Sequence, residues 1–169
     1  MIIVYRIANR ELTNYITQAD VEKAVKDANL SFSELFNSEK TEVLADVVYE
    51  LHKAHASKNG GRLLFTTRRG TTKVPTEIIL MSENNQEGIY GTLKDFGKYS
   101  SKDPDDNYTV PLLWDQENVY VEQESNFAWF EIENVKIIDN KQLRSYTAMI
   151  DNKPVPITNC PIHSPFYAN

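Results

Sequence analysis

The sequence contains no long hydrophobic run and almost no cysteine. A helix that crosses a membrane needs about 18 or more consecutive apolar residues, and the 169 residues contain no such run. Cys160 is the only cysteine, which excludes the internal disulfide framework of many small secreted proteins. Because the first ten residues contain two arginines and no apolar stretch follows them, we expect no secretory signal, no membrane association and a cytoplasmic location.

Common catalytic and nucleotide-binding motifs are also missing. The sequence has neither the glycine-rich fingerprints of dinucleotide-binding and P-loop proteins nor the H-E-x-x-H and G-x-S-x-G motifs of zinc proteases and α/β-hydrolases. These absences favour a non-enzymatic protein without a resident cofactor. An enzyme that acts on nucleotides or nucleic acid is the third of the functions that we consider.

One stretch of the chain has no acidic residue. The net charge is −6, but residues 51–76 contain neither Asp nor Glu. Six of the 18 basic residues lie in this stretch: Lys53, Lys58, Arg62, Arg68, Arg69 and Lys73. An acidic body disfavours non-specific binding of duplex DNA, because such binding depends on neutralising many phosphates. A confined basic stretch instead predicts a small, phosphate-bearing ligand.

The composition and the hydrophobic periodicity predict one α+β domain. A chain with 41% hydrophobic and 25% charged residues is typical of globular proteins, and its length allows one full core. The first residues, 2–7, predict a strand. Apolar residues spaced three and four apart predict helices over residues 17–28 and 38–59, the second ending at Gly60 and Gly61. A short helical turn over residues 31–36 is expected to bury Phe32.

From residue 62 onward the periodicity is that of strands. The expected strands are residues 63–67, 75–81, 89–93, 119–124, 127–132, 135–138 and 146–150. We expect Arg68-Arg69-Gly70 to join the first two as a hairpin. Residues 97–107 are polar and predict an exposed loop.

The order of these elements determines the predicted fold class. Since helices do not alternate with strands after residue 60, we expect an α+β fold rather than a doubly wound sheet. Two or three N-terminal helices would pack on a mainly antiparallel sheet, either flat or curled into a half-open barrel. The domain is expected to span residues 1–153, and the proline-rich residues 154–169 to form an extended tail on the surface.

The basic hairpin is the first candidate site. Guanidinium groups, hydroxyls and loop amides are the groups that hold phosphate or carboxylate. The predicted ligand-binding residues are Arg62, Thr67, Arg68, Arg69, Thr71 and Lys73. Because side chains alternate along a strand, we expect only one of Arg68 and Arg69 to contact a given ligand. Alternatively, these residues form a solvated sheet edge that prevents aggregation.

An acidic and aromatic segment is the second candidate site. Its predicted partner-binding residues are Tyr99, Asp103, Asp105, Asp106, Tyr108 and Trp114. Exposed carboxylates could occupy a basic partner surface, and the rings could anchor a partner or stack on a base. The alternative, which we favour for the rings, is that they belong to the core.

Three histidines and the cysteine raise the question of a metal site. His52 and His55 share a helix face, and Cys160 and His163 have a spacing that suits metal ligands. Nothing in the sequence brings the two pairs together, so we predict no metal.

Paired glutamates on one strand face are the last pattern of this kind. Glu122 with Glu124, and Glu131 with Glu133, are two residues apart and could hold a cation or serve in acid–base chemistry. We expect these pairs to form a solvated surface instead.

Three functions follow from these patterns. The leading hypothesis is a non-enzymatic protein that binds a phosphate-bearing small molecule, such as a nucleotide, through the basic hairpin. The second is an inhibitor of the kind encoded by phages and mobile elements, which would cover a basic surface of a protein partner. The third is the enzyme named above. The sequence is compatible with either a monomer or a homo-oligomer.

Overall fold

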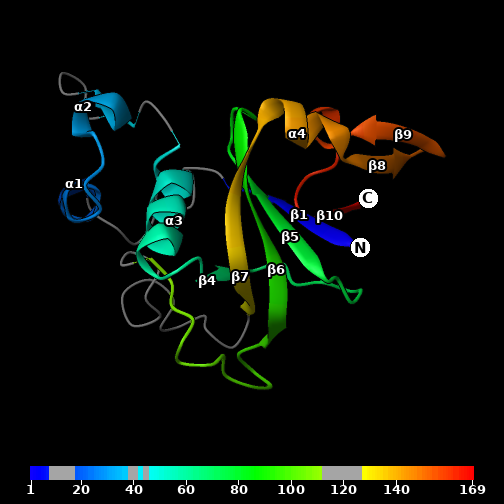
Figure 1. Ribbon diagram of the computed structural model, residues 1–169, viewed down its shortest axis with the longest axis horizontal. Coiled ribbons are helices and arrows are strands. Elements are labelled where there is room, and N and C mark those ends of the chain that lie inside the picture. The colour runs from blue at the N-terminus through cyan, green and yellow to red at the C-terminus, as the bar shows by residue number, and fades with distance from the viewer. Residues whose placement is uncertain (8–17, 38–41, 44–45, 112–126) are drawn as a thin grey trace.

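The computed structural model describes residues 1–7, 18–37, 42–43, 46–111 and 127–169 (Figure 1). These residues contain a six-stranded sheet with the strand order β10-β1-β5-β6-β7-β4. Its strands are β1 (Ile2–Arg6), β4 (Leu63–Thr67), β5 (Glu77–Met81), β6 (Glu87–Lys98), β7 (Ala128–Asp139) and β10 (Phe166–Ala168). Two small sheets pair β2 (Phe36–Asn37) with β3 (Glu42–Val43) and β8 (Thr147–Ile150) with β9 (Lys153–Pro156). The helices are α1 (Gln18–Asp27), α2 (Phe32–Leu35), α3 (Val47–Lys58), α4 (Asn140–Ser145) and the 3-10 helix η5 (Ile157–Asn159).

The prediction of an α+β fold with a mainly antiparallel sheet is confirmed. Among the described strands of the large sheet, β1 and β5 are parallel, and every other neighbouring pair is antiparallel. The helix predicted at residues 17–28 is α1. The second predicted helix ends where expected, because Gly60 and Gly61 follow α3 with φ values of 64° and 77°, the left-handed conformation that ends many helices.

The sheet is open but strongly curled. Three strands separate β1 from β4, and since neighbouring strands lie about 4.8 Å apart, a flat sheet would place these two about 19 Å apart. Yet the rings of Tyr5 in β1 and Phe65 in β4 have centroids only 5.0 Å apart. The pairing of β6 with β7 is irregular between Tyr90 and Thr92 and again between Leu93 and Asp95. Bulges of this kind bend a strand.

The curl gives the sheet a concave and a convex face, each with its own hydrophobic cluster. On the concave face, Tyr5, Leu80 and Phe130 share a cluster with apolar side chains of α1, α2 and α3. On the convex face, Val4 and Ile79 cluster with Leu143 of α4 and with residues near the C-terminus. Figure 1 accordingly shows α1, α2 and α3 on one side of the sheet and α4 with β8 and β9 on the other.

The N-terminal part differs from the prediction in two respects. Helix α3 begins at Val47, so residues 42–43, predicted to be helical, form strand β3 instead; Ser38, the predicted helix start, lies outside the described residues. Phe32 is 37% exposed and was wrongly predicted to be buried. Its ring stacks on that of Phe36, with the centroids 4.8 Å apart, so contact with a neighbouring ring replaces burial in the core.

The predicted hairpin between residues 63–67 and 75–81 is wrong. Strand β4 pairs with β7, and β5 lies between β1 and β6. The reason is burial, because Ile78, Ile79, Leu80 and Met81 are all 0% exposed and therefore need a strand on each side and a covered face above and below. Residues 127–132 and 135–138, predicted as two strands, belong to the single strand β7, and residues 119–124 lie outside the described part.

Residues 154–169 were wrongly predicted to be coil, although the domain boundary at residue 153 stays a prediction. This segment contains β10, which pairs with β1, and its residues Ile157, Cys160, Phe166 and Ala168 are buried. The prolines that suggested coil lie in β9 and in the turns before β10, where no ladder hydrogen bond from their nitrogen is needed.

Arg6 ties this C-terminal segment to β1. Its guanidinium donates hydrogen bonds to the backbone carbonyls of Ile162 (2.8 Å), Ile157 (3.2 Å) and Cys160 (2.7 Å). The same group lies 5.2 Å from the centre of the Phe166 ring. These bonds supply a partner for carbonyls in a segment of irregular backbone. Within the described ranges, no helix is long and apolar enough to cross a membrane.

Gly91 lies at the first irregularity of β6, and its lack of a side chain allows the close packing there. A Cβ atom at this position would lie 2.3 Å from Cγ2 of Ile132 and 3.0 Å from the carbonyl oxygen of Glu133. We therefore expect Gly91→Ala to lower the free energy of unfolding by about 1–3 kcal/mol, the usual cost of overpacking a core. Urea unfolding would measure this. Thr92→Ser, an exposed change on the same strand, should stay within about 0.5 kcal/mol of wild type, and an equally small effect of Gly91→Ala would contradict the prediction.

Candidate functional site

The basic loop, residues 68–76, connects β4 to β5 and is held in place at three points. The hydroxyl of Tyr5 donates a hydrogen bond to the Arg69 carbonyl (2.5 Å). The hydroxyl of Tyr167 in β10 accepts one from the Thr72 amide (3.1 Å) and shares another with the Thr71 hydroxyl (2.8 Å). At the end of the loop, the Thr76 amide donates to the carbonyl of Met1 (3.0 Å). The loop backbone is thus fixed by both ends of the chain.

The cationic side chains of this loop are exposed and have different neighbours. Arg69 donates from Nη1 to the Ser164 carbonyl at 3.3 Å, and the Lys73 ammonium lies 4.8 Å from the centre of the Tyr167 ring. Among the described residues, neither side chain forms an ion pair with a carboxylate. The Arg68 guanidinium lies 5.7 Å from the centre of the Phe127 ring, so the two arginines face different surroundings.

Hydrogen bonds from the loop change the acidity of Tyr167. Burial alone would raise the pKa of this phenol, but its hydrogen bonds with Thr71 and Thr72 outweigh burial and lower the pKa below its ordinary value. The same contacts order the loop. The phenol oxygen therefore accepts the Thr72 amide hydrogen, and the Lys73 ammonium lies over the same ring.

Lys98 lies beside the loop, although it is not among the residues predicted from the sequence. It is the last residue of β6 and pairs with Ala128 of β7, which pairs on its other side with Thr67 of β4. A Cβ atom on Gly70 would lie 3.1 Å from the Cβ of Ala128 and 3.8 Å from the Cε of Lys98. Only the strand register could have identified Lys98, and that register depends on long-range pairing.

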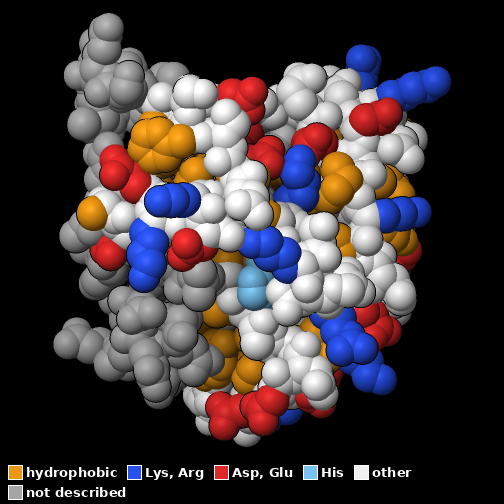
Figure 2. All heavy atoms as spheres, turned by 60° about the vertical axis from the view of Figure 1, so that its left-hand side comes forward, with side chains coloured by type: hydrophobic (Ala, Val, Ile, Leu, Met, Phe, Trp, Pro, Cys, Tyr) orange, Lys and Arg blue, Asp and Glu red, His pale blue; other side chains and the backbone are white. Residues whose placement is uncertain are grey.

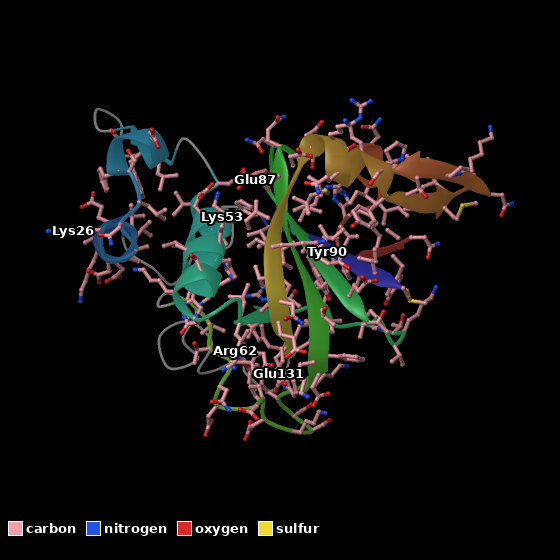
Figure 3. The ribbon with its side chains drawn as sticks, in the orientation of Figure 1. Lys26, Lys53, Arg62, Glu87, Tyr90 and Glu131 are labelled. Carbon is pink, nitrogen blue, oxygen red and sulfur yellow. The ribbon has the colours of Figure 1, made fainter. Side chains whose placement is uncertain are left out.

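Not all the predicted ligand residues come together. Thr67, Arg68, Arg69, Thr71 and Lys73 lie in or next to the basic loop. Arg62 instead precedes the first residue of β4, and since a strand rises about 3.3 Å per residue, the strand separates it from the loop by about 17 Å. The positive charge of Arg62 favours the ionised form of the Tyr108 phenol and so opposes the rise of its pKa. Figure 3 shows Arg62 near Glu131.

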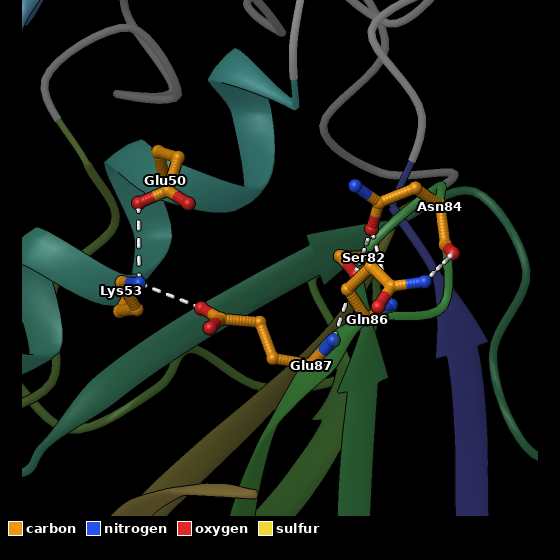
Figure 4. A network of polar contacts seen from close by, with 6 residues as sticks. All are labelled: Glu50, Lys53, Ser82, Asn84, Gln86 and Glu87. Atoms are coloured by element: carbon orange, nitrogen blue, oxygen red, sulfur yellow. Dashed lines mark hydrogen bonds and ion pairs between the residues drawn. The ribbon is translucent and has the colours of Figure 1, made fainter. Parts of the chain in front are cut away.

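Two other basic residues of the acid-free stretch are bound to the body of the protein. Lys53 of α3 pairs with Glu50 (3.3 Å) and with Glu87 of β6 (2.6 Å), as Figure 4 shows. Burial would lower the pKa of Lys53, but the two carboxylates outweigh it and raise the pKa. Lys58 donates to the carbonyl of Asp27 (2.6 Å). The charge of Lys53 is therefore neutralised locally, and only part of the basic stretch remains available to an anion.

The acidic segment covers the convex face of the sheet with its rings and exposes its carboxylates. Tyr108 is 8% exposed, and its cluster includes Leu64 and Trp129. Its hydroxyl donates to Oε2 of Glu133 (2.9 Å). Burial, followed by this carboxylate, raises the pKa of Tyr108 to about 12. Tyr108 thus packs on the sheet, as favoured for the rings, while Trp114 lies outside the described residues.

Asp103, Asp105 and Asp106 are exposed, as predicted for this loop. Figure 2 shows acidic side chains gathered at the lower end of the molecule, where Figure 1 places the segment that follows β6. Glu131 was wrongly expected to be solvated. It is 4% exposed because this segment lies over it, and its Oε1 accepts the amide hydrogen of Asp105 (2.7 Å).

The histidines of α3 make contacts within the protein. His52 is 2% exposed and donates from Nδ1 to the Val48 carbonyl (2.7 Å), while His55 shares a hydrogen bond with the Thr109 hydroxyl (2.9 Å). Cys160 is buried and His163 exposed in the C-terminal segment. In the part of the chain that the structure describes, no three His, Cys, Asp or Glu side chains are placed to hold a metal ion.

Comparison with known proteins finds no matching family model, no matching curated protein and no matching solved structure. Any functional argument therefore depends on the geometry of the residues described above.

The buried imidazole of His52 should make the protein sensitive to acid. Burial lowers the pKa of His52 to about 4, whereas an unfolded histidine has a pKa near 6.5. Between these values the unfolded chain binds the additional proton, so stability falls as the pH falls. We expect His52 to contribute up to about 1.4 kcal/mol per pH unit to this loss between pH 6 and pH 4.5. Urea unfolding of wild type and His52→Gln would measure it.

His55→Gln serves as the matched control for this experiment. His55 lies one turn further along α3 and is less buried, so its variant should keep most of the pH dependence. Equal slopes for wild type and His52→Gln would show that His52 is not responsible.

Proposed function

We propose that this protein is a non-enzymatic binding protein whose basic loop holds a phosphate-bearing small molecule such as a nucleotide. One observation carries the proposal: Arg69 and Lys73 are exposed on a loop whose backbone is fixed, and neither is ion-paired with a described carboxylate. A guanidinium offers a planar set of donors and an ammonium a mobile point charge, and both suit phosphate oxygens.

The fixed backbone supports the proposal energetically. Ordering a flexible loop on binding would cost free energy, and a loop already held by Tyr5, Tyr167 and Met1 avoids most of that cost. The hydroxyl of Thr71 is already used within the loop, because it donates to the Lys73 carbonyl (2.7 Å). We therefore assign Thr71 to shaping the loop rather than to contacting the ligand.

The position of the nearest carboxylates also supports an anionic ligand. Glu77, the first acidic residue after the loop, is the neighbour of Ile78 on β5. Because Ile78 faces the concave side, Glu77 faces the convex side. Its carboxylate accepts a hydrogen bond from the Tyr90 hydroxyl. Strand alternation thus turns this charge away from the face that carries Lys98 and Tyr5.

The second candidate function, a protein inhibitor, has narrower support. Asp103, Asp105 and Asp106 are exposed, but the ring of Tyr108 is occupied by its packing on the sheet. Such an inhibitor would bind through charge alone rather than through an aromatic anchor. For either function we propose a cytoplasmic protein, and the single buried thiol of Cys160 is compatible with that location.

Removing one loop cation should weaken anion binding while leaving the fold intact. We expect Lys73→Ala and Arg69→Ala each to lower the affinity for pyrophosphate or a nucleotide about tenfold or more, since a charge-assisted hydrogen bond contributes about 1.5–3 kcal/mol. Calorimetric titration at fixed ionic strength would measure this. Each variant also loses one contact with the C-terminal segment, to the Ser164 carbonyl for Arg69 and to the Tyr167 ring for Lys73.

Arg62→Ala is the matched control for these substitutions. This variant removes one positive charge from the same acid-free stretch but at the far end of β4. If the site is local, the affinity of the variant for pyrophosphate should remain within about twofold of wild type. An equal loss in Arg62→Ala would indicate only a general electrostatic effect. Absence of any binding to the wild-type protein would contradict the proposed function.

A further inference from the structure

Cations lie on both sides of the basic loop. On one side, Arg69 and Lys73 contact the C-terminal segment through Ser164 and the Tyr167 ring. On the other, Gly70 faces Ala128, and the Lys98 side chain passes within contact distance of it. Lys98 is exposed and forms no ion pair with any carboxylate in the described ranges.

The register of the sheet explains why positive charge gathers on this side. Ala128 belongs to the concave-face cluster, and Lys98 stands directly opposite it. Asp95 and Glu131 are each three residues away along their strands, an odd spacing that places them on the convex face. There Asp95 pairs with Lys102 (2.8 Å), and Glu131 accepts the Asp105 amide hydrogen.

Gly70 makes the approach of Lys98 possible. With no side chain, its backbone lies against Ala128; a Cβ atom would stand only 3.1 Å from the Ala128 Cβ, tighter than ordinary packing allows. The lysine side chain extends past this backbone. As a result, Lys98 flanks the loop from the side opposite to the contacts of Arg69 and Lys73.

We infer that the site has a second phosphate subsite at Lys98 and Gly70, so that its ligand carries at least two linked phosphoryl groups. This inference rests on the proposed function and specifies its ligand class. A single phosphate group that engages Arg69 and Lys73 would leave the Lys98 charge on the other side of the backbone without a counter-charge. A diphosphate, whether free pyrophosphate or the end of a nucleoside diphosphate, supplies a second phosphoryl group for the Lys98 charge.

The test compares ligands that differ by one phosphoryl group. Calorimetric titration of the whole protein would use orthophosphate, pyrophosphate, a nucleoside monophosphate and the matching diphosphate at constant ionic strength. We expect pyrophosphate to bind at least tenfold more tightly than orthophosphate, and the diphosphate at least tenfold more tightly than the monophosphate. If the ratio of affinities for the nucleoside diphosphate and monophosphate exceeds the ratio for pyrophosphate and orthophosphate, the ligand is a nucleotide. If the second ratio is the larger, the ligand is free pyrophosphate.

The variant that carries the test is Lys98→Gln. It should lower the affinity for pyrophosphate at least fivefold while leaving that for orthophosphate within twofold, and Lys98→Arg should keep the preference. Lys94→Gln is the control, because Lys94 is exposed on the same strand but four residues from the loop contact. Thermal unfolding midpoints would establish that the variants are folded.

The outcomes separate this inference from the proposed function. If orthophosphate and pyrophosphate bind equally, or Lys98→Gln weakens both alike, the second subsite is wrong while anion binding at the loop stands. Stronger binding of a short single-stranded oligonucleotide than of pyrophosphate would also overturn it, in favour of a nucleic-acid backbone. If no anion binds the wild-type protein, the proposed function fails and this inference fails with it.

Discussion

The position of Tyr5 is the constraint on which most of this structure depends. Its ring lies 5.0 Å from that of Phe65 and 5.5 Å from that of Phe130, so β1 contacts two strands that a flat sheet would hold far away. Its hydroxyl donates to the Arg69 carbonyl. Burial raises the pKa of this phenol well above its usual range, so Tyr5 keeps its proton at physiological pH. One side chain therefore joins the curl of the sheet to the conformation of the basic loop.

The curl and the alternation of side chains together distribute the charges of an acidic protein. At the end of β6 and β7 near the basic loop, Asp95, Glu131 and Glu133 occupy convex-face positions, where the segment after β6 covers Glu131 and supplies partners for Asp95 and Glu133. At the same end of these strands, Lys98 lies on the concave face beside the basic loop. A net charge of −6 thus coexists with a local cationic surface, because at this end of the sheet Lys98 and the three carboxylates lie on opposite faces.

Local patterns in the sequence predicted the elements whose determinants are local. Helix α1 follows from the spacing of Val21, Ala24 and Val25, and the end of α3 follows from two glycines. The basic loop was also found from sequence, because the absence of acidic residues is visible without any structure. The partner of each strand was not predictable in this way: β4 pairs with β7 across about 60 residues, in a register that places Phe65 opposite Phe130. Lys98 was missed for the same reason.

The pairing of β1 with β10 has a mechanical consequence. Ile2 stands opposite Ala168 in an antiparallel ladder, so Met1 and Asn169 emerge side by side, as Figure 1 shows. A force that pulls these two ends apart acts across the ladder and loads its hydrogen bonds one after another rather than all together. Such a ladder opens like a zipper at low force. The third residue to detach from the C-terminal side would be Tyr167, and with it the basic loop would lose one of its anchors.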